Sequence, residues 1–549
     1  MSRYAAERPA TGPSSRGMDL LQLPVLGRFL RWRHARTALQ SLMLVLAGLV
    51  ILDGLFGPQL APRNLSGILP WVHWRGFVVL ALLLAGNLFC MACPFMLPRR
   101  LAKRFLPADR SWPEVLGAKW VALGLLLLFF WAYEAFSLWA SPWLTAWVAL
   151  AYFAVAFTVD GFFRGAAFCK HVCPIGQFNF VNGMISPTEV RAKDLDVCTA
   201  CTTKDCIRGR YATGFGGSRP GGASGERDPI RLDGDRGLAL LESWTGTGAP
   251  VEARGLRVGN AGRRAAAGQA GGTEGLLQSG CELGLYQPRK EGNLDCTFCL
   301  ECIHACPHDN VGILLRSSIR ELSTDPVRSG VGRISRRPEL AALAAVLVFG
   351  AFFNAFGMVE PVFALRARVA QALPLLWEPT TLLFFMAGGL ALVPGLLLLG
   401  CAAASRALSG GRGGLVERIS VYIWALVPLG FGMWAAHYLF HLLVGGLTIL
   451  PVVQEYLSHV GLSGEVTPRW GLGPMVPESW LLPIELFLLQ GGLFLTLVAG
   501  FRIAQREEGS RRRAGRAFLP WTFLAVLLFG AGVWLLLQPM EMRGTFQVL

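Results

Sequence analysis

Residues 296–307 carry four cysteines at short, regular intervals, in the order Cys296-Thr-Phe-Cys299-Leu-Glu-Cys302-Ile-His-Ala-Cys306-Pro307. This is the C-x2-C-x2-C-x3-C-P spacing in which three thiolates bind one [4Fe–4S] cluster and the fourth thiolate binds another. A short loop of this length can deliver three sulfurs to three irons of one cube. A zinc site would instead need two cysteine pairs separated by a longer gap. The segment therefore predicts iron–sulfur ligands.

The role of the fourth cysteine requires a partner motif, and Cys198-Thr-Ala-Cys201-Thr-Thr-Lys-Asp-Cys206 supplies one with C-x2-C-x4-C spacing. Its own fourth cysteine would be Cys281, which lies 281 − 206 = 75 positions further on and is not followed by proline. The two-cluster arrangement predicts one ligand set of Cys198, Cys201, Cys206 and Cys306, and a second set of Cys281, Cys296, Cys299 and Cys302.

A long insertion separates the two motifs. Residues 207–280 contain 19 glycines in 74 residues together with many arginines, and no helical or strand period persists through most of them. We expect a flexible surface excursion. It is either a tolerated insertion or an arm that docks an acidic redox partner.

Two further cysteine pairs stand where helices are expected to meet the membrane surface. Cys90-Met-Ala-Cys93-Pro and Cys169-Lys-His-Val-Cys173-Pro share a Cys-Pro ending. Together the four thiols form either a third iron–sulfur or metal centre or a redox-active set. The alternative is two ordinary helix-terminal turns with spare thiols.

The chain around the cysteines has the composition of a membrane protein. Of its 549 residues, 53% are hydrophobic and 16% are charged, and the mean hydropathy is +0.45. Soluble domains carry roughly 25% charged residues. Nine apolar stretches approach the roughly 20 residues that a bilayer requires. They lie near 39–57, 75–96, 118–140, 143–163, 340–358, 380–404, 419–447, 480–502 and 518–537.

The net charge of 51 − 36 = +15 is assigned to loops at the membrane and not to nucleic-acid binding. Arginine and lysine gather in the N-terminal segment and in the loops near 97–117, 405–418 and 503–517, whereas the loop near 448–479 holds Arg469 alone. If nine spans alternate, the four basic segments share one side, and the positive-inside rule makes that side cytoplasmic. The prediction is a multi-pass protein of the bacterial inner membrane, with its cysteine-rich domain in the cytoplasm and its C-terminus outside.

These motifs resemble the membrane-bound polyferredoxins typified by NapH and the C-terminal half of NosR. The resemblance rests on the Cys90/Cys93 and Cys169/Cys173 pairs followed by the two-cluster segment 198–307, and it covers roughly residues 39–315. It implies electron transfer between the quinol pool and another redox protein, or a part in maturing a metalloenzyme. The chain departs from the family in its C-x2-C-P first pair, its long insertion and its additional spans after residue 337.

The second membrane half carries four residues with ligand chemistry. His437 and His441 are spaced i, i+4 and share a helix face. With Met540 and Met542 beyond the last span they form a hypothetical outer metal site, because imidazole and thioether suit copper and imidazole also suits haem iron. The alternative is that the histidines hydrogen-bond between helices or line a quinone pocket, while the methionines pack.

Three other residues with ionisable or thiol side chains lie inside predicted spans. Acidic groups within a membrane are rare and usually functional, so Glu134 and Asp160 are candidates to accept the protons that quinol oxidation releases. A structural hydrogen bond is the alternative for Glu134. Cys401 stands alone in an apolar span and is expected to be a packing residue.

The sequence as a whole predicts an all-α polytopic membrane protein of about nine transmembrane helices, with an inserted α+β domain of the bacterial two-cluster ferredoxin type. Its parts are a cytoplasmic segment at 1–38, four helices at 39–165, the ferredoxin domain at 166–337 and five helices at 338–549. The expected function is electron transfer between membrane quinone and a redox protein. The rivals are a biogenesis factor that reduces a metal ion or thiol for a respiratory enzyme, and a transporter or sensor whose clusters report redox state.

Overall fold

The computed structural model describes six segments of the chain. They are residues 18–107, 110–211, 276–372, 378–411, 413–462 and 467–540. Most of the predicted insertion 207–280 lies outside these segments, as does Met542.

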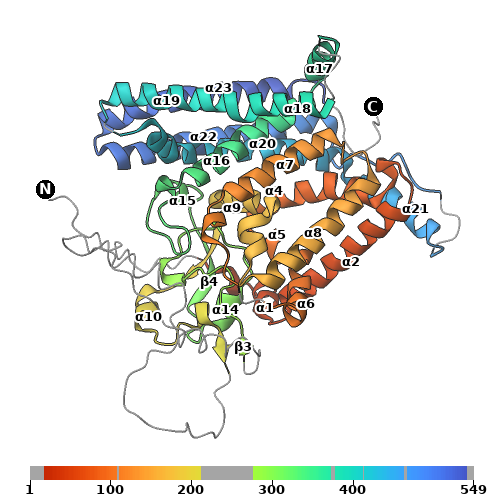
Figure 1. The fold of residues 1–549 in the computed structure, drawn as a ribbon, viewed down its shortest axis with the longest axis horizontal. Coiled ribbons are helices and arrows are strands. Elements are labelled where there is room, and N and C mark those ends of the chain that lie inside the picture. Colours follow the sequence, from red (N-terminus) through yellow and green to blue (C-terminus); the bar gives the residue numbers. More distant parts are fainter. Residues whose placement is uncertain are drawn as a thin grey trace, which may run out of the picture.

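Two groups of helices make up most of the described chain (Figure 1). The first group comprises α2 (Ala35–Phe56), α3 (Leu65–Ile68), α4 (Arg75–Leu84), α7 (Trp120–Ala135) and α8 (Pro142–Phe162). The second comprises α16 (Pro338–Phe356), α18 (Glu378–Ala387), α19 (Val393–Ser409), α20 (Leu415–Gly445), α22 (Leu481–Glu508) and α23 (Arg511–Leu536). The groups join where α4 packs on α20 and α7 packs on α16 and α18.

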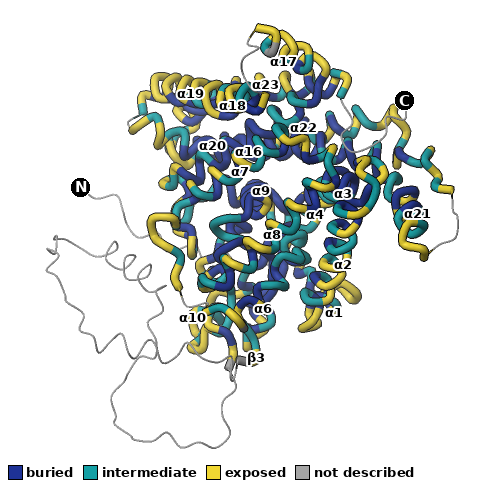
Figure 2. The backbone as a smooth tube through the Cα atoms, turned by 45° about the vertical axis from the view of Figure 1, so that its right-hand side comes forward, coloured by how far each residue is buried: buried dark blue, intermediate teal, exposed yellow. Residues whose placement is uncertain are grey.

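Within the described segments, eight helical stretches are long and apolar enough to cross a membrane by length and composition. This confirms the multi-pass, largely helical architecture predicted from hydropathy. Helix α20 is buried along most of its length (Figure 2), whereas α22 exposes Phe487, Phe494 and Phe501 at seven-residue intervals. Seven residues are about two helical turns, so these rings form one apolar stripe of the kind that lipid covers.

The predicted span at 118–140 is shorter than expected. Its helix α7 has only 16 residues, so eight of the nine predicted stretches are long and apolar enough to cross a membrane. The helix is bounded by Lys119, whose side chain is buried in an ion pair with Asp295, and ends just before Ser137, which has a left-handed φ of 44°. The two ends of α7 contact different parts of the protein. Lys119 at one end contacts the central region, and the Tyr133 ring near the other end packs against Trp71, just before α4.

The second predicted span, 75–96, was also misplaced. The apolar helical stretch runs over Leu65–Leu84 and includes a π-helical turn at Leu69–Trp74. The chain then breaks at Gly86, whose φ is +82° and where a Cβ would lie 2.7 Å from both Thr188 and Phe298. Only glycine fits this close approach. Cys90 consequently lies beyond the break, in the short helix α5 (Leu88–Met91).

The central region is a small α+β unit beside the helix ends. Strand β1 (Thr188–Ala192) pairs antiparallel with β4 (Val311–Leu315), which joins the two ends of the cysteine-rich segment. Strand β2 (Arg210–Tyr211) pairs with β3 (Leu276–Gln278). The short helices here are α9 (Pro174–Asn182), α10 (Leu195–Ala200), α11 (Asp205–Arg208), α14 (Glu301–Ala305) and α15 (Arg320–Ser323). The remaining helices are α1 (Leu26–Arg31), α6 (Leu97–Phe105), α17 (Glu360–Ala372) and α21 (Ile449–His459).

The four basic segments lie on the face that holds the central region. Three of them contact that region directly, through Arg31–Asp309 at 3.3 Å, Arg99–Glu282, and Arg506 donating to the Ser323 carbonyl at 2.8 Å. In the fourth segment Arg418 pairs with Glu508 at the end of α22, 3.2 Å away. The C-terminal ends of α16 and α23 contact each other through a backbone bridge between Val359 and Met540.

Candidate metal centres

Twelve of the 13 cysteines gather into three groups of four in space, and Cys401 is the exception. Group A is Cys198, Cys201, Cys206 and Cys306; group B is Cys281, Cys296, Cys299 and Cys302; group C is Cys90, Cys93, Cys169 and Cys173. All 13 are free thiols in the structure. Groups A and B are the two ligand sets that the motif spacing predicts.

Group A surrounds a cavity of about 350 Å³, a volume that includes the space at its open mouth. Asn310 donates to two of its sulfurs, from the backbone N–H to Cys306 at 3.4 Å and from Nδ2 to Cys198 at 3.3 Å. Burial raises the pKa of the Cys206 thiol to about 11. At Cys201 burial is slight, and the Lys204 N–H and the Thr203 hydroxyl hold the thiol pKa below its usual value.

Group B is more deeply enclosed. Cys296, Cys299 and Cys302 are buried, and burial raises the pKa of Cys299 to about 12 although Arg36 opposes the shift. The loop that carries them holds Asp295, Phe298 and Leu300 at left-handed φ values of 61°, 53° and 61°. Such conformations are costly for residues other than glycine, and they collect at sites where the backbone must wrap a ligand. Lys204, in the loop between Cys201 and Cys206 of group A, has the same conformation, with φ of 53°.

Cys281 occupies in group B the place that Cys306 occupies in group A. The backbone N–H of Leu285 donates to the Cys281 sulfur at 3.4 Å, four residues on, as Asn310 does for Cys306. Burial raises the Cys281 pKa, and the Cys296 sulfur lies close enough to add to this effect. The structure thus places Cys281 with its predicted set.

The two groups touch through backbone. The Cys281 N–H donates to the Cys206 carbonyl at 2.9 Å, and helix α14 carries Cys302 and ends at Cys306. Cys302 of group B and Cys306 of group A therefore lie in the same short segment, and Cys281 of group B is hydrogen-bonded to Cys206 of group A.

Group C unites the two predicted helix-end pairs. Cys90 lies in α5, and Cys93 follows it. Cys169 lies in a π-helical turn (Phe168–Val172), and Cys173 caps α9. Burial raises the pKa of Cys90 to about 11 and that of Cys173 to about 12. Neither pair directly ends a membrane-spanning helix as expected, because irregular residues intervene.

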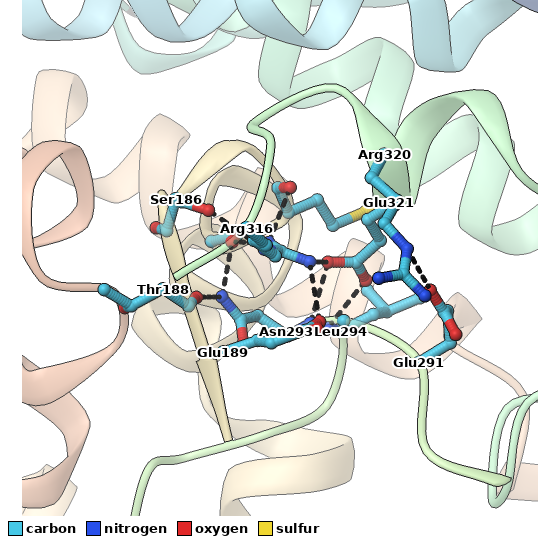
Figure 3. Close-up of polar contacts among 12 residues, drawn as sticks. Ser186, Thr188, Glu189, Glu291, Asn293, Leu294, Arg316, Arg320 and Glu321 are labelled. Atoms are coloured by element: carbon cyan, nitrogen blue, oxygen red, sulfur yellow. Dashed lines mark hydrogen bonds and ion pairs between the residues drawn. The ribbon is translucent and has the colours of Figure 1, made fainter. Parts of the chain in front are cut away.

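A buried ion network positions the loop before Cys296 (Figure 3). The Glu321 carboxylate accepts from the Asn293 and Leu294 N–H groups at 2.7 and 3.1 Å, and it pairs with Arg316 at 2.6 Å and with Arg328 at 2.8 Å. Burial alone would raise the pKa of Glu321, but the two guanidinium groups outweigh it and hold the pKa below its usual value.

The same network explains an adjacent glycine. Gly292 has a φ of +71°, and a Cβ there would overlap the Glu321 carboxylate. Glu321 was not predicted, because a Glu in a segment that also holds Arg316, Arg320, Asp325 and Arg328 carries no local sign of full burial.

A second buried pair joins α7 to group B. Lys119 donates to Asp295 at 2.7 Å and to the Lys170 carbonyl at 2.7 Å, and both charged side chains are at most 5% exposed. Lys119→Met would leave Asp295 buried without its cation, and we expect the free energy of unfolding to fall by about 3–5 kcal/mol. Thermal unfolding in detergent measures this loss. The double variant Lys119→Met/Asp295→Asn should recover most of it, and an unchanged single variant would show that the pair does not stabilise the fold.

Asp160 has a structural partner. Its carboxylate accepts from the Phe168 N–H at 2.8 Å and faces Arg99 at 3.8 Å. It thus anchors the turn that carries Cys169, a role that needs no proton transfer. Glu134 lies on α7 near Gly357. Cys401 donates to the Pro520 carbonyl at 3.6 Å and thus makes a contact between helices α19 and α23.

The predicted outer metal site is described only in part. His437 and His441 are both buried in α20, with ring centroids 4.9 Å apart and nearly perpendicular planes. Met540 bridges to Val359, and Met542 lies outside the described residues. The contacts of the described residues do not bring Met540 to the histidines.

In the part of the chain that the structure describes, no three His, Cys, Asp or Glu side chains converge on a point suited to a single metal ion. The four thiols of group A line one cavity, and N–H donors are directed at sulfurs of all three groups.

The helices and the cysteine groups define a multi-pass helical membrane protein with a small cysteine-rich α+β unit at one face. No protein-family model matches this chain, and no curated protein or solved structure is significantly similar to it.

Proposed function

We propose that the protein is a membrane-bound iron–sulfur electron carrier in which groups A and B each hold a [4Fe–4S] cluster. One observation carries this proposal. Cysteines up to 108 positions apart (306 − 198) meet in two groups of four, and a backbone hydrogen bond links the two groups. Thiolate-bound clusters of this kind accept and donate single electrons.

The surrounding residues would set the reduction potential of a cluster bound to these groups. Asn310 and the Leu285 N–H donate to the cysteine sulfurs, which favours the thiolate form and raises the reduction potential of the bound cluster. Arg36 is a neighbour of Cys299 and pairs with Glu301 at 2.6 Å. Arg36 also pairs with Glu282 at 3.4 Å, so a guanidinium between two carboxylates lies beside group B.

The open mouth of group A suits exchange with a soluble redox protein, while group B faces the helix ends. The positive-inside rule places the basic face, and with it both groups, in the cytoplasm of a bacterial inner membrane with the C-terminus outside. Membrane quinone is the proposed partner on the lipid side, consistent with the resemblance to NapH/NosR-type polyferredoxins.

Iron and acid-labile sulfide analysis of anaerobically purified protein tests the proposal. We expect at least eight irons per chain, because each [4Fe–4S] cluster contributes about four. Low-temperature EPR should show reduced clusters after dithionite, and a quinol analogue should reduce them in part. Colourless, iron-free protein, or clusters that exchange no electrons with quinol or quinone, would contradict it.

A further inference from the structure

Group C gathers four thiols from two segments that lie 169 − 93 = 76 positions apart. Each of the six pairs that Cys90, Cys93, Cys169 and Cys173 can form is close enough for one sulfur to perturb the charge of the other. Five of the six pairs in group A and five of the six in group B show the same proximity. The sequence pairs Cys90/Cys93 and Cys169/Cys173 are therefore halves of one site.

Two of the four sulfurs of group C also receive directed hydrogen bonds, while the Cys169 thiol lies 3.1 Å from the Met96 sulfur. The Gly176 backbone N–H donates to Cys173 at 3.2 Å, and Asn179 Nδ2 donates to Cys90 at 3.2 Å. Group A has the same combination of one backbone N–H and one asparagine amide. A neutral thiol is a weak acceptor, whereas a metal-bound thiolate is a stronger one, so this pattern indicates ligand sulfurs.

Group C lies between group B and the membrane helices. Cys90 is an electrostatic neighbour of Cys296, and Asn87, three residues before Cys90, donates to the Cys296 carbonyl at 2.9 Å. On its other side Tyr152 of α8 neighbours Cys173 and Cys93 and packs against Phe168. Arg36, at the start of α2, neighbours both Cys93 and Cys299 and so supplies positive charge between groups B and C.

We propose that group C holds a third [4Fe–4S] cluster and that the three groups form a series, A to B to C, ending at the membrane helices. This inference rests on the proposed electron-carrier function and extends it. Clusters held by the three groups would pass one electron at a time from one group to the next, with no proton or bond exchanged. Four thiols match the ligand number of one cubane.

Iron content of variants made in the full chain tests this. Wild-type protein should carry about twelve irons per chain, and Cys90→Ser/Cys93→Ser and Cys169→Ser/Cys173→Ser should each carry about eight. Cys401→Ser is the matched control and should keep about twelve. EPR of the dithionite-reduced double variants should lose one cluster signal and keep the signals of groups A and B, which also reports that the central region is folded.

Wild-type protein with about eight irons, unchanged in both double variants, would overturn the third cluster and leave the proposed function standing. Eight irons together with reversible oxidation of these four cysteines, measured by differential alkylation and mass spectrometry, would assign group C to thiol chemistry and equally overturn it. If a double variant does not fold, the single variant Asn179→Leu keeps every cysteine. It should retain about twelve irons and shift one EPR signal and its midpoint potential to a more negative value, and no shift would count against the site.

Discussion

A Cys281→Ala variant is expected to lose the cluster of group B and to keep that of group A. Cys281 contributes a sulfur to group B, but its contact with group A is made by the backbone N–H to the Cys206 carbonyl, which alanine retains. The iron content should fall by about four per chain. Because group B stands between group A and the membrane helices, reduction of group A by a quinol analogue should fall to the background rate. Dithionite, which reaches group A from solution, should still reduce it.

The reciprocal variant Cys198→Ala identifies the signals. It should remove the EPR signal of group A, leave that of group B and leave quinol-driven reduction of group B intact. Cys401→Ala controls for loss of a thiol elsewhere. If Cys281→Ala instead removed the same signal as Cys198→Ala, Cys281 would belong to group A and the two-set assignment would be wrong.

Glu321→Gln is expected to lower the free energy of unfolding by about 3–5 kcal/mol, because it leaves the buried Arg328 without the anion that it pairs with and leaves Arg316 with Glu189, 3.4 Å away. The side chains of Arg316 and Arg328 are 1% and 2% exposed. The variant also weakens the acceptor that holds the Asn293 and Leu294 N–H groups ahead of Cys296. We expect a lower midpoint of thermal unfolding in detergent and faster loss of iron from group B.

Glu291→Gln is the matched control, since Glu291 makes a single pair with Arg320, which is 44% exposed (Figure 3). Exposed pairs contribute about 0–1 kcal/mol, so this variant should differ little from wild type. The folded-state pKa of Glu321 is depressed, so its stabilisation is present above the unfolded pKa and is lost as the pH falls through the folded value. Equal stability of the two variants would show that the network does not hold the loop.

The cysteine spacing predicted which cysteines of groups A and B lie together, for a physical reason. A cluster takes three ligands from one short loop, so the ligand pattern is local and visible in residues 296–302 and 198–206. The pairing of Cys306 and Cys281 with opposite loops followed from the two-cluster rule, and the structure places them there. The predicted ferredoxin function and the family resemblance stay predictions.

The membrane spans were predicted in number more closely than in bounds. Hydropathy detects apolar length, so the long helices of the C-terminal half were found. It does not detect a backbone break, so the displacement of the second span by Gly86 and the shortness of α7 were missed. Both follow from contacts with Thr188, Phe298 and Asp295, which are distant in the sequence.

By itself the amino-acid sequence determined that the chain is a multi-pass helical protein and which cysteines share a loop, because apolar length and ligand spacing are properties of neighbouring residues. Only the tertiary structure decided that Cys90 and Cys93 join Cys169 and Cys173, that Asn87 connects them to Cys296, and that Glu321 is buried between two arginines. Such contacts depend on how helices and loops far apart in the chain pack against each other, and no local pattern records that packing.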